Sequence, residues 1–531
     1  MDKNTVIGLL LIFGLFMGFS FYQTHRNQKI REEQEKTMAE QAANPKQEQE
    51  TLSLADTVAQ TDTTAVKETK SPAQVFSNPQ VSNEDDYVVE TDKAIYRFGK
   101  KGGCLKSAIL KDVYRYTPKG ETKQPLELFA DGTNEMSIGL MLRDQTEIST
   151  KDCYFISDTE DTLKVDGKNN TLILRLYPNY KGEAVECGML DNASYIEYAY
   201  SFSNEDYRFG FKIRFVNMED YLYANKHDYT LVWNAQPECV EKNYEYEKNI
   251  TSVYYMDNVN EVDNLDERKD DKKDFTSPLK WVSFKQQFFT TCLIVDDEPF
   301  QSGTLSVNVP DKSEQSVLKN CNAELDFEIK DLNKGDFGMS MYVGPNQYKL
   351  LKTYGMKLER QVPLGWGFFL LHWVNRFVII PVFNWLEAYG LSYGLIILIL
   401  TIFIKIVVLP VSYKTYMSSA KMRALKPEIE AINARYPKDE DMMKKQQATM
   451  NLYRSAGVSP AGGCVPMLLQ MPILIAMYRF FPAAYELRQQ SFLWAEDLST
   501  YDSIWDFGFN VPLYGDHMSL FTILMTIATI V

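Results

Sequence analysis

Basic residues are in the minority in this chain of 531 residues, and cysteine, proline and glycine are all modest in number. Lys and Arg total 56 against 71 Asp and Glu. The resulting net charge of −15 argues against a nucleic-acid-binding protein, which would present a basic face. With 7 Cys, 21 Pro and 27 Gly, the composition also excludes a disulfide scaffold, a mucin-like stalk and a collagen. What is present becomes clear only when the chain is read in successive windows.

An uncharged apolar run occupies residues 6–22 near the N-terminus. As a helix, at about 1.5 Å per residue, it approaches the thickness of a bilayer core, which is roughly 30 Å. No A-x-A-like cleavage site follows the run and the first cysteine is Cys104, so neither a cleavable signal peptide nor a lipoprotein signal fits. We therefore expect an uncleaved transmembrane anchor over residues 1–22. The polar stretch 23–86 has too little apolar surface to fold and is expected to be a disordered linker.

Strand patterns dominate the middle of the chain, residues 87–350. Apolar and polar residues alternate over 196–202, 209–215 and 325–329, and such runs are separated by Asn, Asp, Gly and Pro. Many short alternating runs of this kind indicate a large antiparallel β-sandwich, and the segment is long enough for one sizeable core.

The β-patterned segment carries little chemistry. Its one histidine, His227, lies in a polar stretch and is interpreted as a surface residue. No metal-ligand cluster, phosphate-binding loop or nucleophile motif is found there, so we expect neither an enzyme nor a cofactor. The cysteines of this segment leave disulfides open but fit no known framework, and ordinary buried thiols are the simpler interpretation for Cys104, Cys153, Cys187, Cys239, Cys292 and Cys321.

The C-terminal third alternates between apolar spans and polar loops. Within a connecting segment, 351–391, residues 366–389 are rich in aromatic and apolar side chains but interrupted by charged and polar ones. This mixture favours an amphipathic helix in the membrane interface over a buried core helix. Transmembrane helices are expected over 392–413 and 460–484, and the prolines at 466 and 472 should bend the second.

Loop charges give the expected orientation. The loop 414–459 carries nine basic residues against five acidic ones, whereas 485–516 carries one basic and six acidic residues. The positive-inside rule then places 414–459 in the cytoplasm, which exports the β-sandwich and leaves the N-terminus in the cytoplasm. The charges flanking the anchor argue the other way, because Lys3 precedes it and three basic residues follow it. We give the short C-terminal loops more weight.

The basic loop is expected to be a helical hairpin. Helix-forming residues run over 420–434, and apolar residues recur at roughly helical spacing over 439–456 before Gly457, which suits a C′ position. The basic side chains could bind anionic lipid or a protein partner, or could form a solvated face. The candidates for such contacts are Lys421, Arg423, Lys426, Arg435, Lys444 and Lys445.

Lys405 is the single ionisable residue inside the first C-terminal span. A charge near the bilayer centre costs at least about 2.5–3.5 kcal/mol, so such a residue persists where it faces a polar cavity or can reach water. Thr401 lies one turn earlier on the same helical face. A long lysine side chain can also snorkel toward the interface, so a purely structural position stays open.

Several linked motifs follow one another in the C-terminal part: YVGP from residue 342, SYGLIILILTIFIKIVVLPV from 392, LYRSAGVSPAGGCVPMLLQMP from 452 and ELRQQSFLWAEDLSTYDSI from 486. In this order they resemble the YidC/Oxa family of membrane-protein insertases, in its Gram-negative YidC type with a large periplasmic domain. The resemblance covers about 342–531. It implies a multi-domain membrane protein with a periplasmic antiparallel β-supersandwich, a polytopic α-helical core of five helices and a cytoplasmic helical hairpin.

The resemblance also implies a hydrophilic groove in the membrane that holds a positive residue. That residue is usually Arg in the family and is Lys405 here; lysine keeps the charge but lacks the planar fork of donors that captures a carboxylate. Residues of the second span match the family's substrate-contacting helix. Methionine suits varied apolar partners, although a packing role stays open for it. The candidate groove therefore comprises Lys405, Thr401, Cys464, Pro466, Gln470, Met471 and Pro472.

The function implied by the resemblance is insertion and folding of newly made proteins in the bacterial inner membrane, alone or with the Sec translocon. A polar tail of the client would enter the groove near Lys405 while its apolar segment passes into lipid. Partition of about 20 apolar residues supplies the free energy, so no covalent step, nucleotide or cofactor is needed. The expected partners are nascent membrane proteins, the lipid bilayer, the Sec translocon and the ribosome, with no sequence-specific nucleic-acid binding.

Two other functional classes stay open. A transporter would also use an intramembrane charge such as Lys405, but it would need more spans and internal repeats. A membrane-anchored periplasmic protein that binds or modifies sugars would place its function in the β-sandwich, so deletion of that domain would abolish its activity.

The apolar run at 517–531 is too short to span a membrane, and we interpret it as the start of a transmembrane helix in a C-terminally incomplete chain.

Overall fold

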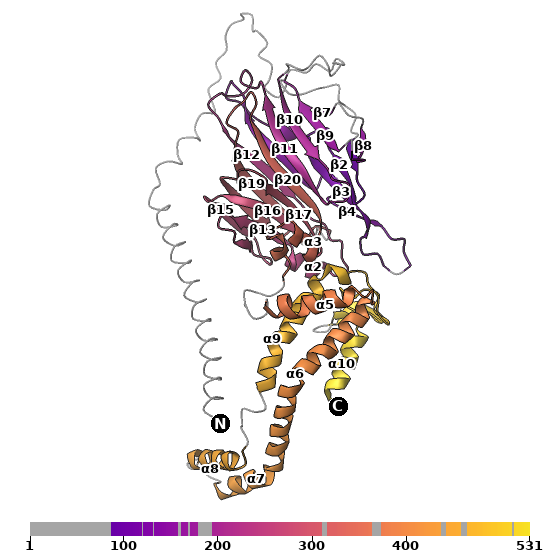
Figure 1. The fold of residues 1–531 in the computed structure, drawn as a ribbon, viewed down its shortest axis with the longest axis vertical. Coiled ribbons are helices and arrows are strands. Elements are labelled where there is room, and N and C mark those ends of the chain that lie inside the picture. Colours follow the sequence, from indigo (N-terminus) through magenta and orange to yellow (C-terminus); the bar gives the residue numbers. More distant parts are fainter. Residues whose placement is uncertain are drawn as a thin grey trace, which may run out of the picture. The chain divides into compact units, whose positions relative to one another are not determined.

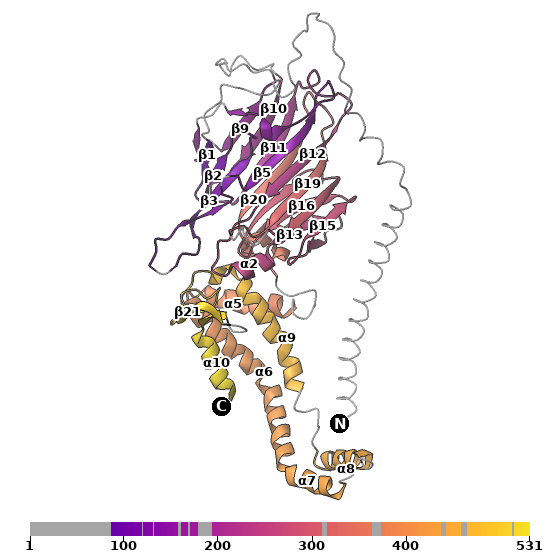
Figure 2. The same cartoon turned by 180° about the vertical axis from the view of Figure 1, so that it is seen from behind.

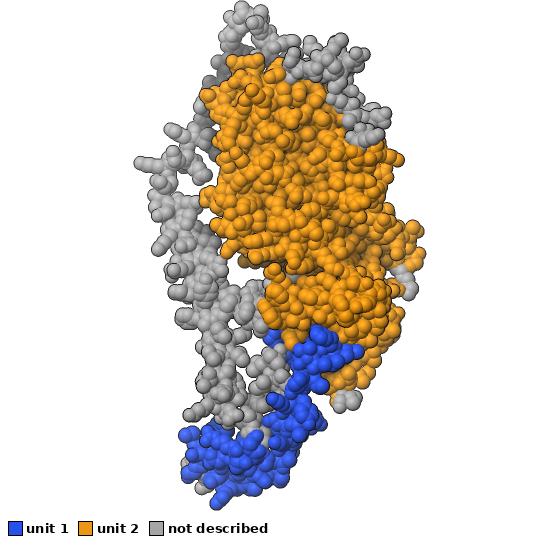
Figure 3. Space-filling view, in the orientation of Figure 1, with its two compact units in different colours: residues 1–68, 401–472 blue, residues 69–400, 473–531 orange. Residues whose placement is uncertain are grey.

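A computed structural model describes residues 86–118, 120–130, 132–157, 161–167, 170–178, 194–310, 316–363, 373–436, 442–457, 465–511 and 515–530. The chain divides into two compact units (Figure 3). One consists of residues 69–400 and 473–531, and the other of residues 1–68 and 401–472. The predicted anchor at 1–22 and the predicted linker, except for residue 86, lie outside the described residues.

Three sheets build the β-domain, residues 87–345 (Figures 1 and 2). The nine-stranded sheet has, in spatial order, β14 (Val262–Asn264), β13 (Ser252–Asp257), β16 (Leu279–Lys285), β17 (Phe289–Val295), β20 (Asp336–Pro345), β11 (Arg208–Val216), β10 (Tyr195–Ser201), β9 (Thr171–Leu176) and β7 (Ile156–Ser157). The six-stranded sheet has β15 (Asp271–Phe275), β18 (Ser302–Asn308), β19 (Asn320–Glu328), β12 (Asp228–Ala235), β5 (Asn134–Met141) and β6 (Glu147–Ser149).

The five-stranded sheet has β4 (Pro125–Leu128), β3 (Leu105–Tyr114), β2 (Ala94–Phe98), β1 (Tyr87–Glu90) and β8 (Thr162–Lys164). Its β1–β8 pair is parallel, whereas the neighbouring β1–β2, β2–β3 and β3–β4 pairs are antiparallel. The two larger sheets are antiparallel at every described strand pair. The alternating runs at 196–202, 209–215 and 325–329 fall on β10, β11 and β19, which confirms those predictions.

One face of β11 shows how the layers pack. Its residues alternate between buried and half-buried along the whole strand, so Phe209 and Phe215 project from the same face. Phe209 packs against Phe98 of β2, with ring centroids 6.1 Å apart, and Phe215 packs against Tyr229 of β12 at 5.1 Å. The five- and six-stranded sheets therefore cover the same face of the nine-stranded sheet, and the domain is a two-layered sandwich.

The described cysteines of the β-domain are free thiols, namely Cys104, Cys153, Cys239, Cys292 and Cys321. Four of the five are buried, as the simpler of the two sequence interpretations predicts, while Cys239 is half-buried. Cys187 lies outside the described residues. His227 is half-buried and its Nδ1 lies 3.2 Å from the carbonyl oxygen of Ile329, a structural contact at the start of β12.

Short helices follow the β-domain. The first is α3 (Tyr348–Thr353), and a π-helical turn (Asn375–Ile379) leads directly into α5 (Ile380–Glu387). The part of the predicted interfacial helix before residue 373 lies outside the described residues. A further helix, α2 (Tyr244–Ile250), lies within the β-domain.

The long helix α6 (Tyr393–Ala424) contains a window, Tyr393–Pro410, with mean hydropathy 2.5. By length and composition this is the one helix among the described residues that could cross a membrane. The second predicted span corresponds to α9 (Val465–Phe480), which ends four residues earlier than expected. There the chain turns into a 3₁₀ helix over Phe481–Ala483 that contains Pro482, and proline cannot continue an α-helix.

Two helices form the basic segment, α7 (Lys426–Arg435) and α8 (Met442–Ser455), and they contact each other. Gly457 after α8 has φ +62°, the left-handed conformation expected of a C′ glycine, which confirms that prediction.

The segment 485–516 is not a plain loop: β21 (Trp505–Val511) pairs with β22 (Gly515–Met518), and α10 (Leu520–Ile530) follows.

Candidate functional site

Lys405 lies on the apolar part of α6, and its side chain is exposed. Its neighbours Ile402 and Ile406 are exposed as well, so this part of the helix presents apolar side chains outward with one ammonium among them. Thr401 is half-buried and lies one turn before Lys405 on the same helical face. An outward apolar surface suits contact with lipid or with an apolar client segment.

The second part of the candidate groove lies on α9. Gln470 and Pro472 are half-buried and Met471 is exposed, in consecutive positions of the helix. Pro472 is inside the helix, where its missing N–H leaves the carbonyl of residue 468 without its usual helical donor. Cys464 and the side chain of Pro466 lie outside the described residues.

All but one of the basic candidates on α6, α7 and α8 are exposed. Lys445 is half-buried, and the side chains of Lys421, Arg423, Lys426, Arg435 and Lys444 are exposed. This arrangement matches both readings of the sequence, a solvated face and a surface for anionic partners.

The chain after α9 is fixed to the β-domain, which the sequence did not predict. We call residues 481–502 the docking segment. Arg488 is buried there: its Nε donates to Glu241 Oε1 at 2.6 Å and its Nη2 donates to the carbonyl oxygen of Tyr114 at 2.6 Å. Gln489 donates to the same carbonyl at 2.8 Å, and Gln287 donates to the carbonyl of Pro482 at 2.9 Å. The one signal in the sequence was Arg488 itself, the lone basic residue of an acidic loop.

Two buried carboxylates share this region. Burial raises the pKa of Glu241, although the guanidinium of Arg488 works against the rise. Burial likewise raises the pKa of Glu247 to about 7, while the backbone N–H groups of Val240 and Glu241, both 3.1 Å from its Oε2, oppose the shift. One buried cation thus serves two buried glutamates. Because Arg488 bonds directly to Glu241, Glu247 is the carboxyl that keeps a proton as the pH approaches neutrality.

Within one unit, the start of α6 contacts α5, and the end of α9 contacts both α5 and the π-turn before it. The Asn375 side-chain amide donates to the carbonyl of Ala476 at 3.1 Å. The ring of Phe383 lies 5.9 Å from that of Tyr393 and 5.5 Å from that of Phe480. Gly394 leaves room for Phe492, because a Cβ at this position would collide with that ring. The described ends of the two candidate membrane helices are therefore packed into one apolar cluster.

Comparisons with known proteins cover nearly the whole chain. Residues 86–376 match the family model described as the YidC periplasmic domain, and residues 385–531 match the model described as the 60Kd inner membrane protein.

The "Membrane protein insertase YidC" of Bacteroides fragilis (strain YCH46) is 37% identical over 100% of this chain and 82% of its own length. The protein of the same name from Porphyromonas gingivalis is 37% identical over 100% of this chain and 83% of its own length. A solved structure of an active YidC insertase aligns with 81% of this chain and 80% of its own at 18% identity, with a TM-score of 0.26. The family models and the identity to full-length relatives show that this chain belongs to the YidC family of membrane protein insertases.

Proposed function

We propose that this protein inserts newly made proteins into the bacterial inner membrane, and that Lys405 receives the polar part of each client. Family membership supports the activity, because the relatives are named membrane protein insertases. The observation that carries the role of Lys405 is its position: an exposed ammonium on a helix whose neighbouring exposed side chains are apolar. A client with an acidic tail would gain attraction from this charge where water is scarce.

The proposed groove comprises Lys405 and Thr401 on α6, Pro466, Gln470, Met471 and Pro472 on α9, and Cys464, which precedes α9 in the sequence. Hydroxyl and amide groups such as those of Thr401 and Gln470 would replace the water lost by a polar tail, which lowers its desolvation cost. The apolar segment of the client would pass into lipid, and burial of about 20 apolar residues would drive the process. No covalent step, nucleotide or cofactor is required.

The proposed topology has nine parts: anchor 1–22, linker 23–86, periplasmic β-sandwich 87–350, connecting and interfacial segment 351–391, transmembrane helix 392–413, cytoplasmic hairpin 414–459, transmembrane helix 460–484, periplasmic loop 485–516 and a further membrane helix from 517. The charge difference between 414–459 and 485–516 supports this orientation. The exposed basic residues of the hairpin would meet anionic lipid, the ribosome or the Sec translocon.

Substitution of Lys405 tests the proposal. Full-length protein in proteoliposomes is given a single-span client whose tail carries two acidic residues, and insertion is scored by protease protection. We expect Lys405→Glu to reduce insertion about tenfold or more, because like charges then meet in a low-dielectric site. Lys405→Arg should retain insertion, since the charge is kept.

Two controls separate the charge effect from misfolding. Lys414→Glu reverses an exposed charge on the same helix outside the apolar window and should leave insertion near the wild-type level. A client with an uncharged tail should be inserted by Lys405→Glu almost as well as by the wild type. Equal insertion of the acidic client by Lys405→Glu and the wild type would remove Lys405 from the mechanism.

A further inference from the structure

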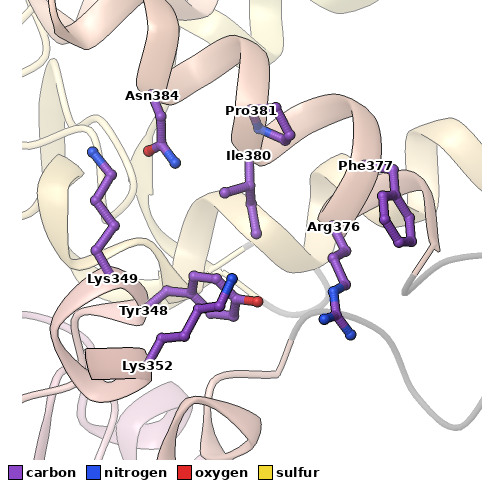
Figure 4. Close-up of a pocket in the computed structure, with 8 residues that line it drawn as sticks. All are labelled: Tyr348, Lys349, Lys352, Arg376, Phe377, Ile380, Pro381 and Asn384. Carbon is purple, nitrogen blue, oxygen red and sulfur yellow. The ribbon is translucent and has the colours of Figure 1, made fainter. Parts of the chain in front are cut away.

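A pocket of about 410 Å³ lies between α3 and the π-turn with α5 (Figure 4). Three of its lining residues are cationic: Lys349 and Lys352 of α3 and Arg376 of the π-turn. In the view of Figure 4 the hydroxyl of Tyr348 lies between the ammonium of Lys352 and the guanidinium of Arg376. Ile380, Pro381, Phe377 and Asn384 complete the lining.

The charges around this pocket are unequal. Lys349 pairs with Glu387, whose second oxygen accepts a hydrogen bond from the Tyr393 hydroxyl at 2.9 Å. A second carboxylate, Glu359, also lies near: burial raises the pKa of Tyr348, and the charge of Glu359 adds to the rise. Neither carboxylate belongs to the lining. Glu387 neutralises Lys349, so Lys352 and Arg376 are two further cations in the pocket wall. Two such charges suit an anionic ligand.

An aromatic stripe adjoins the pocket. Every fourth residue from Trp373 is large or cyclic and exposed: Trp373 is 52% exposed, Phe377 58%, Trp385 61% and Tyr389 65%, with Pro381 in the series. The opposite side of the same segment is buried, with Ile379, Phe383 and Leu386 among its residues. Exposed Trp, Tyr and Phe in a row are typical of a surface at the headgroup level of a bilayer.

Two residues connect these features. Phe377 and Pro381 belong both to the stripe and to the lining of the pocket, so the cationic pocket meets the aromatic surface directly. A ligand that satisfies both must carry a negative charge next to an apolar body. A phospholipid has this chemistry, whereas a free phosphate ion would leave the aromatic stripe without an occupant.

We propose that this pocket binds the phosphate group of an anionic phospholipid. Arg376 offers the planar pair of N–H donors that matches two phosphate oxygens, and Lys352 supplies a second charge. The Tyr348 hydroxyl and the Asn384 amide can donate to the remaining oxygens. The acyl chains would then lie along the stripe. The proposal relies on the membrane location given under the proposed function but not on insertion activity.

Native mass spectrometry of the full-length protein in detergent tests the assignment, with dioleoylphosphatidylglycerol as the probe. The double variant Lys352→Gln/Arg376→Gln should lose the tightest bound lipid, with affinity reduced about tenfold or more, because charge-assisted hydrogen bonds to phosphate are strong. Arg360→Gln is the matched control, because Arg360 is an exposed arginine of the 3₁₀ helix Leu358–Gln361 and does not line the pocket. It should retain the lipid. Unchanged thermal melting of the double variant excludes misfolding as the cause.

Three outcomes would overturn the proposal. Equal retention of phosphatidylglycerol by the double variant and by Arg360→Gln would show that the pocket is not the site. Equal retention of phosphatidylcholine by the wild type would show that negative headgroup charge is not recognised. Displacement of the lipid by millimolar inorganic phosphate would assign the site to the free ion. None of these measurements uses a client protein, so they stand apart from the insertion test of Lys405.

Discussion

Arg488 and Glu241 form a buried ion pair, with Nε and Oε1 2.6 Å apart and side chains that are 4% and 7% exposed. The pair connects the docking segment after α9 to the β-domain, across 247 residues of sequence. Removal of one partner from a buried pair leaves an uncompensated charge in a poorly solvated site. The stability of the folded protein should therefore depend strongly on this contact.

Replacement of Arg488 by Met should lower the free energy of unfolding by about 3–5 kcal/mol, because Glu241 is then buried without its cation. The double variant Arg488→Met/Glu241→Leu should recover much of this loss, since both charges are absent. Denaturant unfolding of the purified protein gives the measurement. Arg143→Met is the control, because Arg143 pairs with Asp220 at 3.6 Å on the surface, and its loss should cost less than about 1 kcal/mol. A double variant no more stable than Arg488→Met would contradict the pairing argument.

Stability should also depend on pH through Glu247. Its pKa is raised to about 7 in the folded protein, so between its ordinary pKa of 4.5 and about 7 the folded state holds a proton that the unfolded chain has lost. The contribution of Glu247 to the free energy of unfolding is therefore complete below pH 4.5. It decreases as the pH rises to about 7, by on the order of 2–3 kcal/mol.

Glu247→Gln should flatten the decline, which thermal melts at pH 5 and pH 8 would reveal. Glu245→Gln, an exposed residue on the same helix, should leave the wild-type pH dependence unchanged. An identical pH profile for Glu247→Gln and the wild type would show that another group titrates.

Gly394 should tolerate no larger side chain. A Cβ at this position would collide with the ring of Phe492, so Gly394→Ala should destabilise the packing of α6 against the docking segment by about 1–3 kcal/mol. Adding Phe492→Ala should make the Gly394 substitution nearly neutral in a double-mutant cycle. Gly139→Ala is the control, since a Cβ there meets nothing within 4 Å. Additive effects of the two substitutions in denaturant unfolding would contradict the proposed collision.

Crosslinking should map the client's path. A photoreactive amino acid at position 401, 405 or 470 should capture a stalled nascent membrane protein several-fold more efficiently than one at position 407. Val407 is exposed on α6, but its side chain projects about 200° around the helix from that of Lys405. Equal capture at positions 405 and 407 would indicate contact with the outside of the helix rather than with a groove.

Local patterns were sufficient for part of this structure. The two-residue alternation of β11 and the long apolar window of α6 depend only on neighbouring residues, so both were predicted. The glycine that ends α8 was predicted for the same reason. The end of α9 at Phe480 was placed too late, because the apolar residues continue through Phe481 and hide the turn at Pro482.

Non-local relationships were not predictable in this way. Nothing near Arg488 in the sequence identifies Glu241 or the carbonyl of Tyr114 as its partners. The pocket beside Arg376 likewise forms only where α3 packs near the π-turn, and more than twenty residues of sequence separate these two elements. Lys405 was singled out because one charge in an apolar window is visible without any knowledge of contacts.

The position of β20 has a consequence for the order in which the β-domain can close. This strand lies between β17 and β11, and it is the last strand of the domain in the sequence. During synthesis from the N-terminus, β17 and β11 each keep an unpaired edge until residues 336–345 have been made. A chain halted before that point would expose two long unpaired strand edges, which can pair with the edges of other such chains.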